Sequence, residues 1–173
     1  MIFLFTGNGK GKTTAAIGQG IRLVGNDKRV IMFQFIKSLK WPTGEEKAIA
    51  KFGSKFRLIK GGKGFVGIMG DKLPFTLHKK AAKDTLARGK QALISKKYDL
   101  VIMDEVNVAL SLKLITLKSV IALIKSTPPK TDLILTGRYA PKALERYADI
   151  MTEFREVKHP YKKGIQGKRG REY

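Results

Sequence analysis

The first fourteen residues constrain this chain more than any other stretch. Ile2 to Phe5 is a short apolar run with β-branched and aromatic side chains, typical of a strand buried on both faces of a sheet. Thr6 to Gly11 is a loop with glycine at every second position, and Lys12 begins a run with a helical pattern. In this order, backbone N–H groups converge at a helix N-terminus, where an anion is stabilised. The stretch therefore predicts a loop that binds phosphate groups.

The loop departs by one residue from the Walker A pattern G-x-x-x-x-G-K-[ST], because Thr6 stands at the first glycine position. In such a loop the Lys12 ammonium reaches phosphate oxygens and the Thr13 hydroxyl reaches Mg²⁺. The alternative is a glycine-rich turn that packs without binding anything, but a Gly-Lys-Thr sequence directly after an apolar strand argues against it. We expect this loop to hold ATP. Its binding residues would be Gly7, Asn8, Gly9, Lys10, Gly11, Lys12, Thr13 and Thr14.

Composition narrows the possible function classes. The 173 residues include no cysteine and only two histidines, which excludes disulfides and Cys-ligated zinc and argues against a His-based metal site. No apolar run approaches the length of a membrane span, and the apolar start lacks the basic region of a signal peptide. We therefore expect a cytoplasmic protein without a membrane partner. Its length predicts one α/β domain over residues 1–154, with residues 155–173 as a basic tail of that domain.

The net charge of +21 is the unusual feature of the composition. It favours polyanionic partners, such as nucleic acid, an anionic membrane surface or a multiply charged nucleotide. A lysine-rich proteome, in which most lysines are solvated, explains the charge equally well. The charge alone does not choose between these interpretations.

Strand and helix patterns alternate along the chain, which predicts a three-layer α/β sandwich with a mostly parallel sheet, as in RecA-like P-loop NTPases. Within the long helix predicted at 75–97, the expected buried side chains are Leu77, Ala81, Leu86, Leu93 and Ile94. The glycine-rich segment 61–74 is either a mobile loop at the mouth of the site or a plain connection. The predicted strands are 2–5, 29–36, 55–59, 98–103, 132–136 and 148–153, and the other predicted helices are 12–25, 45–52, 106–112, 117–125 and 141–147.

Two further predicted strands are followed by charged residues that suit metal or phosphate binding. The strand at 98–103 runs directly into Asp104 and Glu105, the arrangement in which a carboxylate faces the Mg²⁺ of a neighbouring phosphate loop. Which of the two acids contacts the metal is left open, so the predicted metal ligands are Thr13, Asp104 and Glu105. Arg138 follows the strand at 132–136 and is expected to pair with a phosphate; a surface salt bridge is the alternative.

Taken together, the motifs resemble those of the ATP:corrinoid adenosyltransferases of the P-loop type, which share the displaced glycine. The resemblance covers nearly the whole chain. It rests on Thr6–Ala16, Gln34–Lys37 with Trp41–Glu45, Gly64–Phe65, Met103–Glu105, Leu135–Arg138 with Ala140–Pro141, Ala148–Asp149 with Thr152–Glu153, Val157–His159 and the ending Gly164–Ile165, Gly170 and Glu172–Tyr173.

This resemblance implies transfer of the 5′-deoxyadenosyl group of ATP to Co(I) of a reduced corrinoid, with release of tripolyphosphate. It implies catalytic roles for Lys12, Glu105 and Arg138, which would stabilise the charge of the leaving group. It also implies that Phe65 contacts the corrin. Arg22 matches a family position that faces the nucleotide, and an ordinary surface position is the alternative for it. ATP, Mg²⁺ and a corrinoid co-substrate are expected, together with a homodimer and an electron-donating flavoprotein.

One departure from the family pattern concerns the corrin. The family's aromatic loop reads Gly-Phe-Thr-Trp, whereas this chain has Gly64-Phe65-Val66-Gly67, so the tryptophan position holds Gly67. The missing tryptophan and the net charge motivate an alternative function, that of a basic P-loop ATPase that binds nucleic acid.

Overall fold

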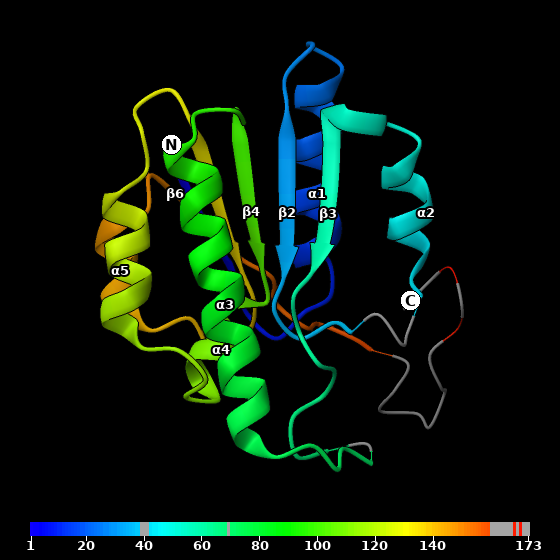
Figure 1. Ribbon diagram of the computed structural model, residues 1–173, viewed down its shortest axis with the longest axis vertical. Helices are drawn as coiled ribbons and strands as arrows, with labels where there is room; N and C mark the ends of the chain where they lie inside the picture. Colours follow the sequence, from blue (N-terminus) through cyan, green and yellow to red (C-terminus); the bar gives the residue numbers. More distant parts are fainter. Residues whose placement is uncertain (39–41, 69, 160–167, 169, 171–173) are drawn as a thin grey trace.

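A parallel β-sheet forms the centre of the computed structural model, which describes residues 1–38, 42–68, 70–159, 168 and 170 (Figure 1). Trp41 and most of the basic tail lie outside the described residues, so the expectations about them are not examined by the structure. Among the described residues the sheet has six strands in the order β3-β2-β4-β5-β1-β6. Every pair of neighbouring strands is parallel, so the expected mostly parallel sheet is parallel throughout its described part.

The elements alternate as the sequence pattern predicts. The strands are β1 (Ile2–Thr6), β2 (Val30–Gln34), β3 (Phe56–Lys60), β4 (Leu100–Asp104), β5 (Asp132–Thr136) and β6 (Ile150–Glu153). The α-helices are α1 (Lys12–Val24), α2 (Gly44–Ala50), α3 (Phe75–Ile94), α4 (Val106–Ser111) and α5 (Leu117–Lys125), and two 3₁₀ helices are η1 (Gly53–Lys55) and η2 (Lys142–Tyr147).

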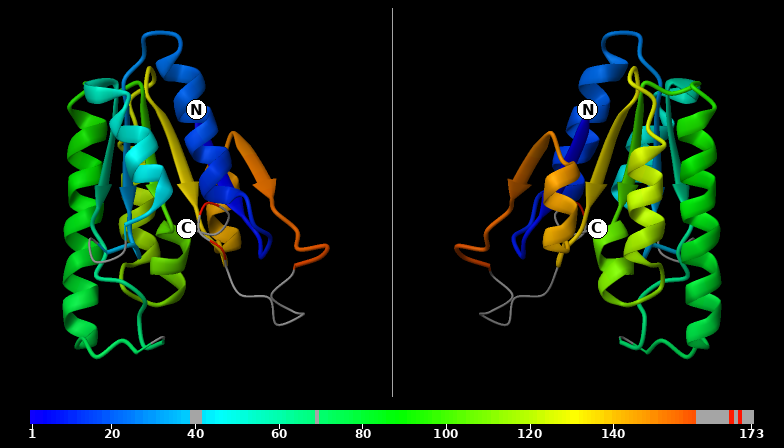
Figure 2. Two further views of the ribbon diagram at one scale, coloured as in Figure 1. Left: turned by 90° about the vertical axis from the view of Figure 1, so that its right-hand side faces the viewer. Right: turned by 90° about the vertical axis from the view of Figure 1, so that its left-hand side faces the viewer.

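Helices cover the sheet on both faces and make the three layers expected of this fold (Figure 2). Side chains of α3, α4 and α5 share one apolar cluster with the sheet, and side chains of α1 and α2 share the other. Strand β4 shows the alternation: Val101 and Met103 belong to the first cluster, Leu100 and Ile102 to the second, and all four are fully buried. Burying one such side chain stabilises the fold by roughly 1.5–3 kcal/mol, which explains why these strands are apolar on both faces.

Close packing sets the position of α1. A Cβ atom on Gly20 would lie 2.6 Å from the ring of Phe56, so the missing side chain lets α1 approach β3. Helix α1 thereby places its N-terminus at the carboxyl edge of the sheet, the lower edge in Figure 1. The loops after β1, β4 and β5 meet at this same edge, because the strands are parallel.

Two expectations about helices are corrected. In α3, Ala81, Leu86 and Leu93 are buried as predicted, but Leu77 is 45% exposed and Ile94 is 54% exposed. The buried stripe of α3 consists largely of small or polar side chains, which hydrophobicity alone does not reveal: His78, Ala81, Ala82, Thr85, Leu86, Gly89, Ala92 and Leu93. The helix expected at 141–147 is a 3₁₀ helix after an extended Pro141, and it buries only Leu144.

Among the described residues, no helix is both long enough and apolar enough to cross a membrane.

Candidate active site

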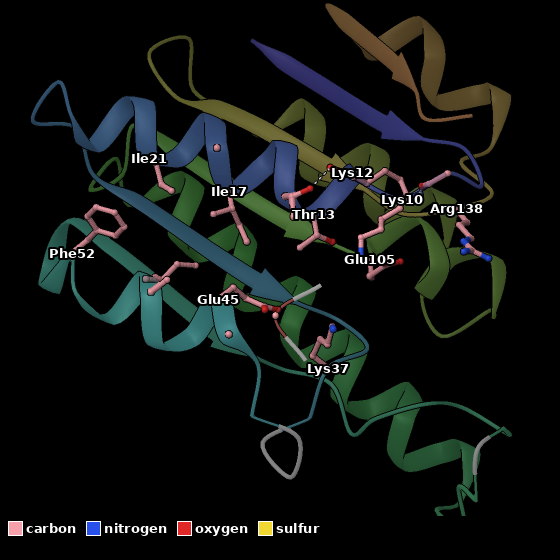
Figure 3. A pocket seen from close by; sticks show the side chains of 18 of the residues that line it. Lys10, Lys12, Thr13, Ile17, Ile21, Lys37, Glu45, Phe52, Glu105 and Arg138 are labelled. Atoms are coloured by element: carbon pink, nitrogen blue, oxygen red, sulfur yellow. Dashed lines mark hydrogen bonds between the residues drawn. The ribbon is translucent and has the colours of Figure 1, made fainter. Parts of the chain in front are cut away.

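A cavity of about 620 Å³ opens at the carboxyl edge of the sheet, between α1 and α2 (Figure 3). Its two ends differ in chemistry. The polar end gathers side chains from the glycine loop and from the ends of β4 and β5, and the apolar end lies between the two helices. The lining residues at the polar end include Gly9, Lys10, Gly11, Lys12, Thr13, Thr14, Lys37, Glu45, Glu105 and Arg138, and those at the apolar end include Ile17, Ile21, Ala48, Ile49 and Phe52.

The glycine loop wraps around the side chain of Lys12. The Lys12 ammonium donates hydrogen bonds to the carbonyl oxygens of Gly7, at 2.7 Å, and of Gly9, at 2.6 Å. Gly7 has a φ of 95° and Gly11 a φ of 120°, and both values lie in the left-handed region that favours glycine. Burial lowers the pKa of Lys12, and the nearby Arg138 lowers it further, whereas Glu105 and Asp104 oppose the shift. The loop therefore holds a cation at the floor of the cavity.

Not every predicted loop residue lines this cavity. The residues from Gly9 to Thr14 do so. Gly7 is absent from the lining, and the exposed Asn8 faces a separate small depression with Glu153 and Arg155. The loop therefore presents its second half to the cavity.

Asp104 at the end of β4 is completely enclosed by protein groups. Its Oδ1 accepts hydrogen bonds from the hydroxyls of Thr13, at 2.9 Å, and Thr136, at 2.7 Å. Its Oδ2 accepts one from the Gln34 amide at 3.2 Å. Burial raises the pKa of Asp104, and these three hydrogen bonds oppose the rise. Because the Thr13 proton is donated to Asp104, a lone pair of the Thr13 oxygen remains for a cation in the cavity.

Glu105 points the other way, into the cavity beside Lys12 (Figure 3). Its backbone has a φ of 63°, in the left-handed region where a residue other than glycine is strained, and its N–H donates to the Thr136 hydroxyl. Burial and the neighbouring Asp104 raise the pKa of Glu105 to about 7, whereas Lys12, Lys37 and Arg138 act to lower it. The strained turn therefore aims one carboxylate at the cavity while its neighbour stays inside the sheet.

The oxygen atoms of this site fit a magnesium ion bound with a triphosphate. Among the described residues, no group of three or more His, Cys, Asp or Glu side chains could hold a metal. Mg²⁺ in nucleotide sites uses one or two protein oxygens and completes its shell with phosphate and water. The Thr13 hydroxyl and the Glu105 carboxylate, which both line the cavity, meet that requirement.

Comparison with known proteins identifies the family. A family model described as ATP:corrinoid adenosyltransferase BtuR/CobO/CobP matches residues 1–173. The chain belongs to this family. The resemblance noted in the sequence is thereby confirmed.

Curated corrinoid adenosyltransferases align along the whole chain. That of Escherichia coli strain K12 is 32% identical over 173 residues, which cover 100% of this chain and 85% of that protein. Corrinoid adenosyltransferase CobA of Salmonella typhimurium strain LT2 is 34% identical over the same share of both chains. The corrinoid adenosyltransferase of Pseudomonas aeruginosa is 33% identical and is covered to 83%. These matches give no support to the alternative of an ATPase that binds nucleic acid.

A solved structure supports the fold. The flagellar accessory protein FlaH from Methanocaldococcus jannaschii superposes with a TM-score of 0.53 at 9% identity, covering 88% of this chain and 70% of that one. A likeness at this identity concerns the fold alone, and it agrees with the predicted P-loop α/β architecture.

Several residues at this site belong to the motifs that carry the family resemblance but were given no site role from the sequence. Lys37 and Glu45 line the cavity, and Gln34 connects Glu45 with Asp104 through its amide, at 3.4 Å and 3.2 Å. The signal for Gln34 and Lys37 is their position at the carboxyl end of a buried strand, the same signal that singled out Asp104. The apolar end of the cavity had no signal, because Ile17 and Phe52 look like ordinary core positions in the sequence.

Besides Gly7, Asn8 and Asp104, two more predicted site residues lie outside the cavity lining. Arg22 is in the last turn of α1 with its side chain exposed, and it is absent from the cavity lining. Phe65 is 47% exposed on the loop between β3 and α3, and it does not line the cavity either. That loop is joined to the site region by a hydrogen bond from the Gly64 N–H to the carbonyl oxygen of Ile36, next to Lys37.

Proposed function

We propose that this chain transfers the 5′-deoxyadenosyl group of ATP to Co(I) of a reduced corrinoid and releases tripolyphosphate. The observation that carries the proposal is the polar end of the cavity. There, Lys12, Thr13, Glu105 and Arg138 come together around the glycine loop in a chain of the ATP:corrinoid adenosyltransferase family. A triphosphate fits the charge of this end, and the cavity is large enough to hold the attached nucleoside.

The reaction is a displacement at the ribose C5′. The Co(I) electron pair forms the new Co–C bond, and the bond from C5′ to oxygen breaks with its electrons going to the triphosphate. The departing group gains negative charge, so we assign catalysis mainly to preorganised positive groups. Lys12, Lys10 and Arg138 supply cationic side chains at the cavity, and the loop supplies backbone N–H groups. This chemistry needs no protein nucleophile and no general base, which fits a site without cysteine.

Thr13 and Glu105 are our proposed ligands for Mg²⁺, which when bound would neutralise part of the triphosphate charge. Asp104 acts on the ion indirectly, because both of its oxygens already accept hydrogen bonds from protein groups and one of these orients the Thr13 hydroxyl. We therefore propose Glu105, rather than Asp104, as the acid that contacts the ion directly.

The corrin contact and the partners extend the proposal. Phe65 is proposed to contact the corrin, because its ring is exposed on the loop next to the site region. Arg22 is left out of the proposed site, since it lies outside the cavity. A homodimer and an electron-donating flavoprotein are proposed from family membership. A cytoplasmic location and the division into a domain over residues 1–154 and a basic tail over residues 155–173 remain proposals from the composition and charge of the sequence.

The decisive experiment is anaerobic incubation of the protein with Mg-ATP and chemically reduced cobalamin. We expect the absorption spectrum of an alkylcobalamin, which reverts in light, and one tripolyphosphate released for each corrinoid converted. Omission of the reductant is the control, since the displacement requires Co(I). An unchanged spectrum together with release of ADP that single-stranded DNA stimulates would refute the proposal and favour the ATPase alternative.

A further inference from the structure

The chain that follows β6 runs beside the glycine loop and continues the sheet pairing into it. Strands β1 and β6 are parallel, and their register ends with Thr6 opposite Glu153. Beyond that point the Phe154 N–H donates to the carbonyl oxygen of Thr6 at 2.8 Å, and the Gly9 N–H donates to the carbonyl oxygen of Phe154 at 2.6 Å. The first half of the loop is therefore bonded to a segment almost 150 residues further along the chain.

The backbones approach so closely that side chains are excluded. A Cβ atom on Gly7 would lie 2.4 Å from the Phe154 carbonyl oxygen, and one on Gly9 would lie 2.7 Å from the Arg155 backbone. Gly9 is not among the glycines with positive φ, so its backbone conformation is open to any residue. What requires glycine at this position is the neighbouring segment.

The ring of Phe154 reaches the second half of the loop. It would contact a Cβ atom on Gly11 at 3.1 Å, and it packs edge to face on Phe5 of β1 with the ring centroids 5.7 Å apart. Gly11 directly precedes Lys12, whose ammonium is bound by the carbonyl oxygens of Gly7 and Gly9. Phe154 thus contacts Gly9 and Gly11, which line the cavity, without being part of the lining itself.

We propose that Phe154 is a positioning residue for nucleotide binding. Its backbone holds Thr6 and Gly9, its ring supports Gly11, and together these contacts fix the loop in the shape that presents Lys12 and the loop N–H groups to the phosphates. The Gly9 N–H already donates to the carbonyl oxygen of Phe154. We therefore expect phosphate to be bound by the N–H groups of the loop residues that follow Gly9. This inference rests on the proposed nucleotide site and adds a residue to it that no Walker-type pattern contains.

The test compares Phe154→Ala and Phe154→Leu with Phe3→Ala. Phe3 is a matched control, because it is also a partly buried aromatic residue that packs edge to face on Phe5, with centroids 6.3 Å apart, toward the end of β1 that is farther from the loop. We expect Phe154→Ala to raise the Kd and KM for Mg-ATP by about tenfold or more, since small displacements of a binding group have large effects. The KM for the corrinoid should stay unchanged, and Phe154→Leu should recover part of the nucleotide affinity.

Equal Mg-ATP affinity in Phe154→Ala and wild type would overturn the inference, as would an equal loss of affinity in Phe3→Ala.

The thermal midpoint of the nucleotide-free variants is measured alongside, and Gly9→Ala replaces Phe154→Ala as the test variant if Phe154→Ala fails to fold. Its control is Gly25→Ala, where a Cβ atom would meet only ordinary contacts at 3.5 Å. We expect Mg-ATP binding to weaken in Gly9→Ala and to stay at the wild-type level in Gly25→Ala. Wild-type affinity in Gly9→Ala would contradict the inference. Mg-ATP binding is measured without corrinoid, so failure of the proposed transferase activity is distinguished from failure of this assignment.

Discussion

Among the proposed phosphate ligands, Lys12 is the one buried cation that the structure describes. It is 6% exposed, binds two loop carbonyls, and stands beside Glu105 and Arg138. We predict that Lys12→Ala lowers turnover by at least about 10²-fold, because it removes a buried cation facing the leaving group and also frees the loop. Rates from the cobalamin assay measure the loss. The exposed Lys125→Ala on α5 is the control, and comparable rates for Lys12→Ala and wild type would remove Lys12 from its role.

The raised pKa of Glu105 leads us to expect that nucleotide binding depends on pH. Because the pKa is raised to about 7, the nucleotide-free protein binds a proton there, which Glu105 would have to release to bind the proposed Mg²⁺. We predict that Mg-ATP affinity falls as pH drops below about 7, by up to about tenfold per pH unit. Titration calorimetry in buffers of different ionisation enthalpy should detect the released proton. Glu105→Gln should abolish this dependence, and an equal slope in that variant would assign the proton to another group.

The same raised pKa has the opposite consequence for folding. The folded-state pKa of Glu105 lies above the ordinary value of 4.5. Protonation of Glu105 therefore stabilises the folded, nucleotide-free protein relative to the unfolded chain. That contribution to the free energy of unfolding is fully present below pH 4.5 and is lost as pH rises through about 7.

At the scale of elements, the loop between β3 and α3 is held together by Asp71. This carboxylate accepts hydrogen bonds from the N–H groups of Gly67, at 2.9 Å, and Leu73, at 3.1 Å, and it pairs with the buried His78 of α3 at 2.9 Å. Gly67, at the position of the family's tryptophan, has a φ of 69°. The position of the family's tryptophan is therefore a left-handed turn residue whose N–H donates to Asp71.

We predict that Gly67→Trp tightens corrinoid binding at a moderate loss of stability. A Cβ atom there meets nothing within 4 Å, so the new ring has room, but a left-handed conformation costs a residue other than glycine about 1–2 kcal/mol. Spectroscopic titration with corrinoid measures the affinity. Gly70→Trp is the matched control, since Gly70 has a φ of 78° and equally open surroundings. If both variants bind corrinoid as the wild type does, this loop does not face the corrin.

At the scale of the whole molecule, stability resides in the sheet and its two apolar clusters. Ile102 lies on the central strand β4 and is fully buried. We predict that Ile102→Ala lowers the free energy of unfolding by about 2–5 kcal/mol, through lost burial and the cavity left behind. Urea titration measures the change. Ile150→Ala on the edge strand β6 is the control, because that side chain is 38% exposed and should cost much less.

The elements that the sequence predicted correctly are those with a local cause. Strands β1, β2, β4 and β5 were predicted because a strand buried on both faces is a nearly continuous apolar run, whereas the edge strand β3 carries Arg57 and Lys60. The register of α3 was partly wrong because its buried face uses Ala81, Ala82 and Gly89, where close packing on the sheet matters more than hydrophobicity. A Cβ atom on Gly89 would lie 2.3 Å from the Met103 side chain, a contact that only the fold creates.

The candidate site likewise has features that the local sequence predicts and features that it does not. The sequence by itself determined the strand, glycine loop and helix N-terminus, and the acids at the end of β4, because residues that are neighbours in the chain create these features. Only the tertiary structure decided that Asp104 is enclosed while Glu105 faces the cavity, since Thr136 and Gln34 come from other strands. It also decided that Phe154, far along the chain, accepts a hydrogen bond from the N–H of Gly9 in the loop. Such contacts depend on which strands pair, and local sequence patterns do not encode that pairing.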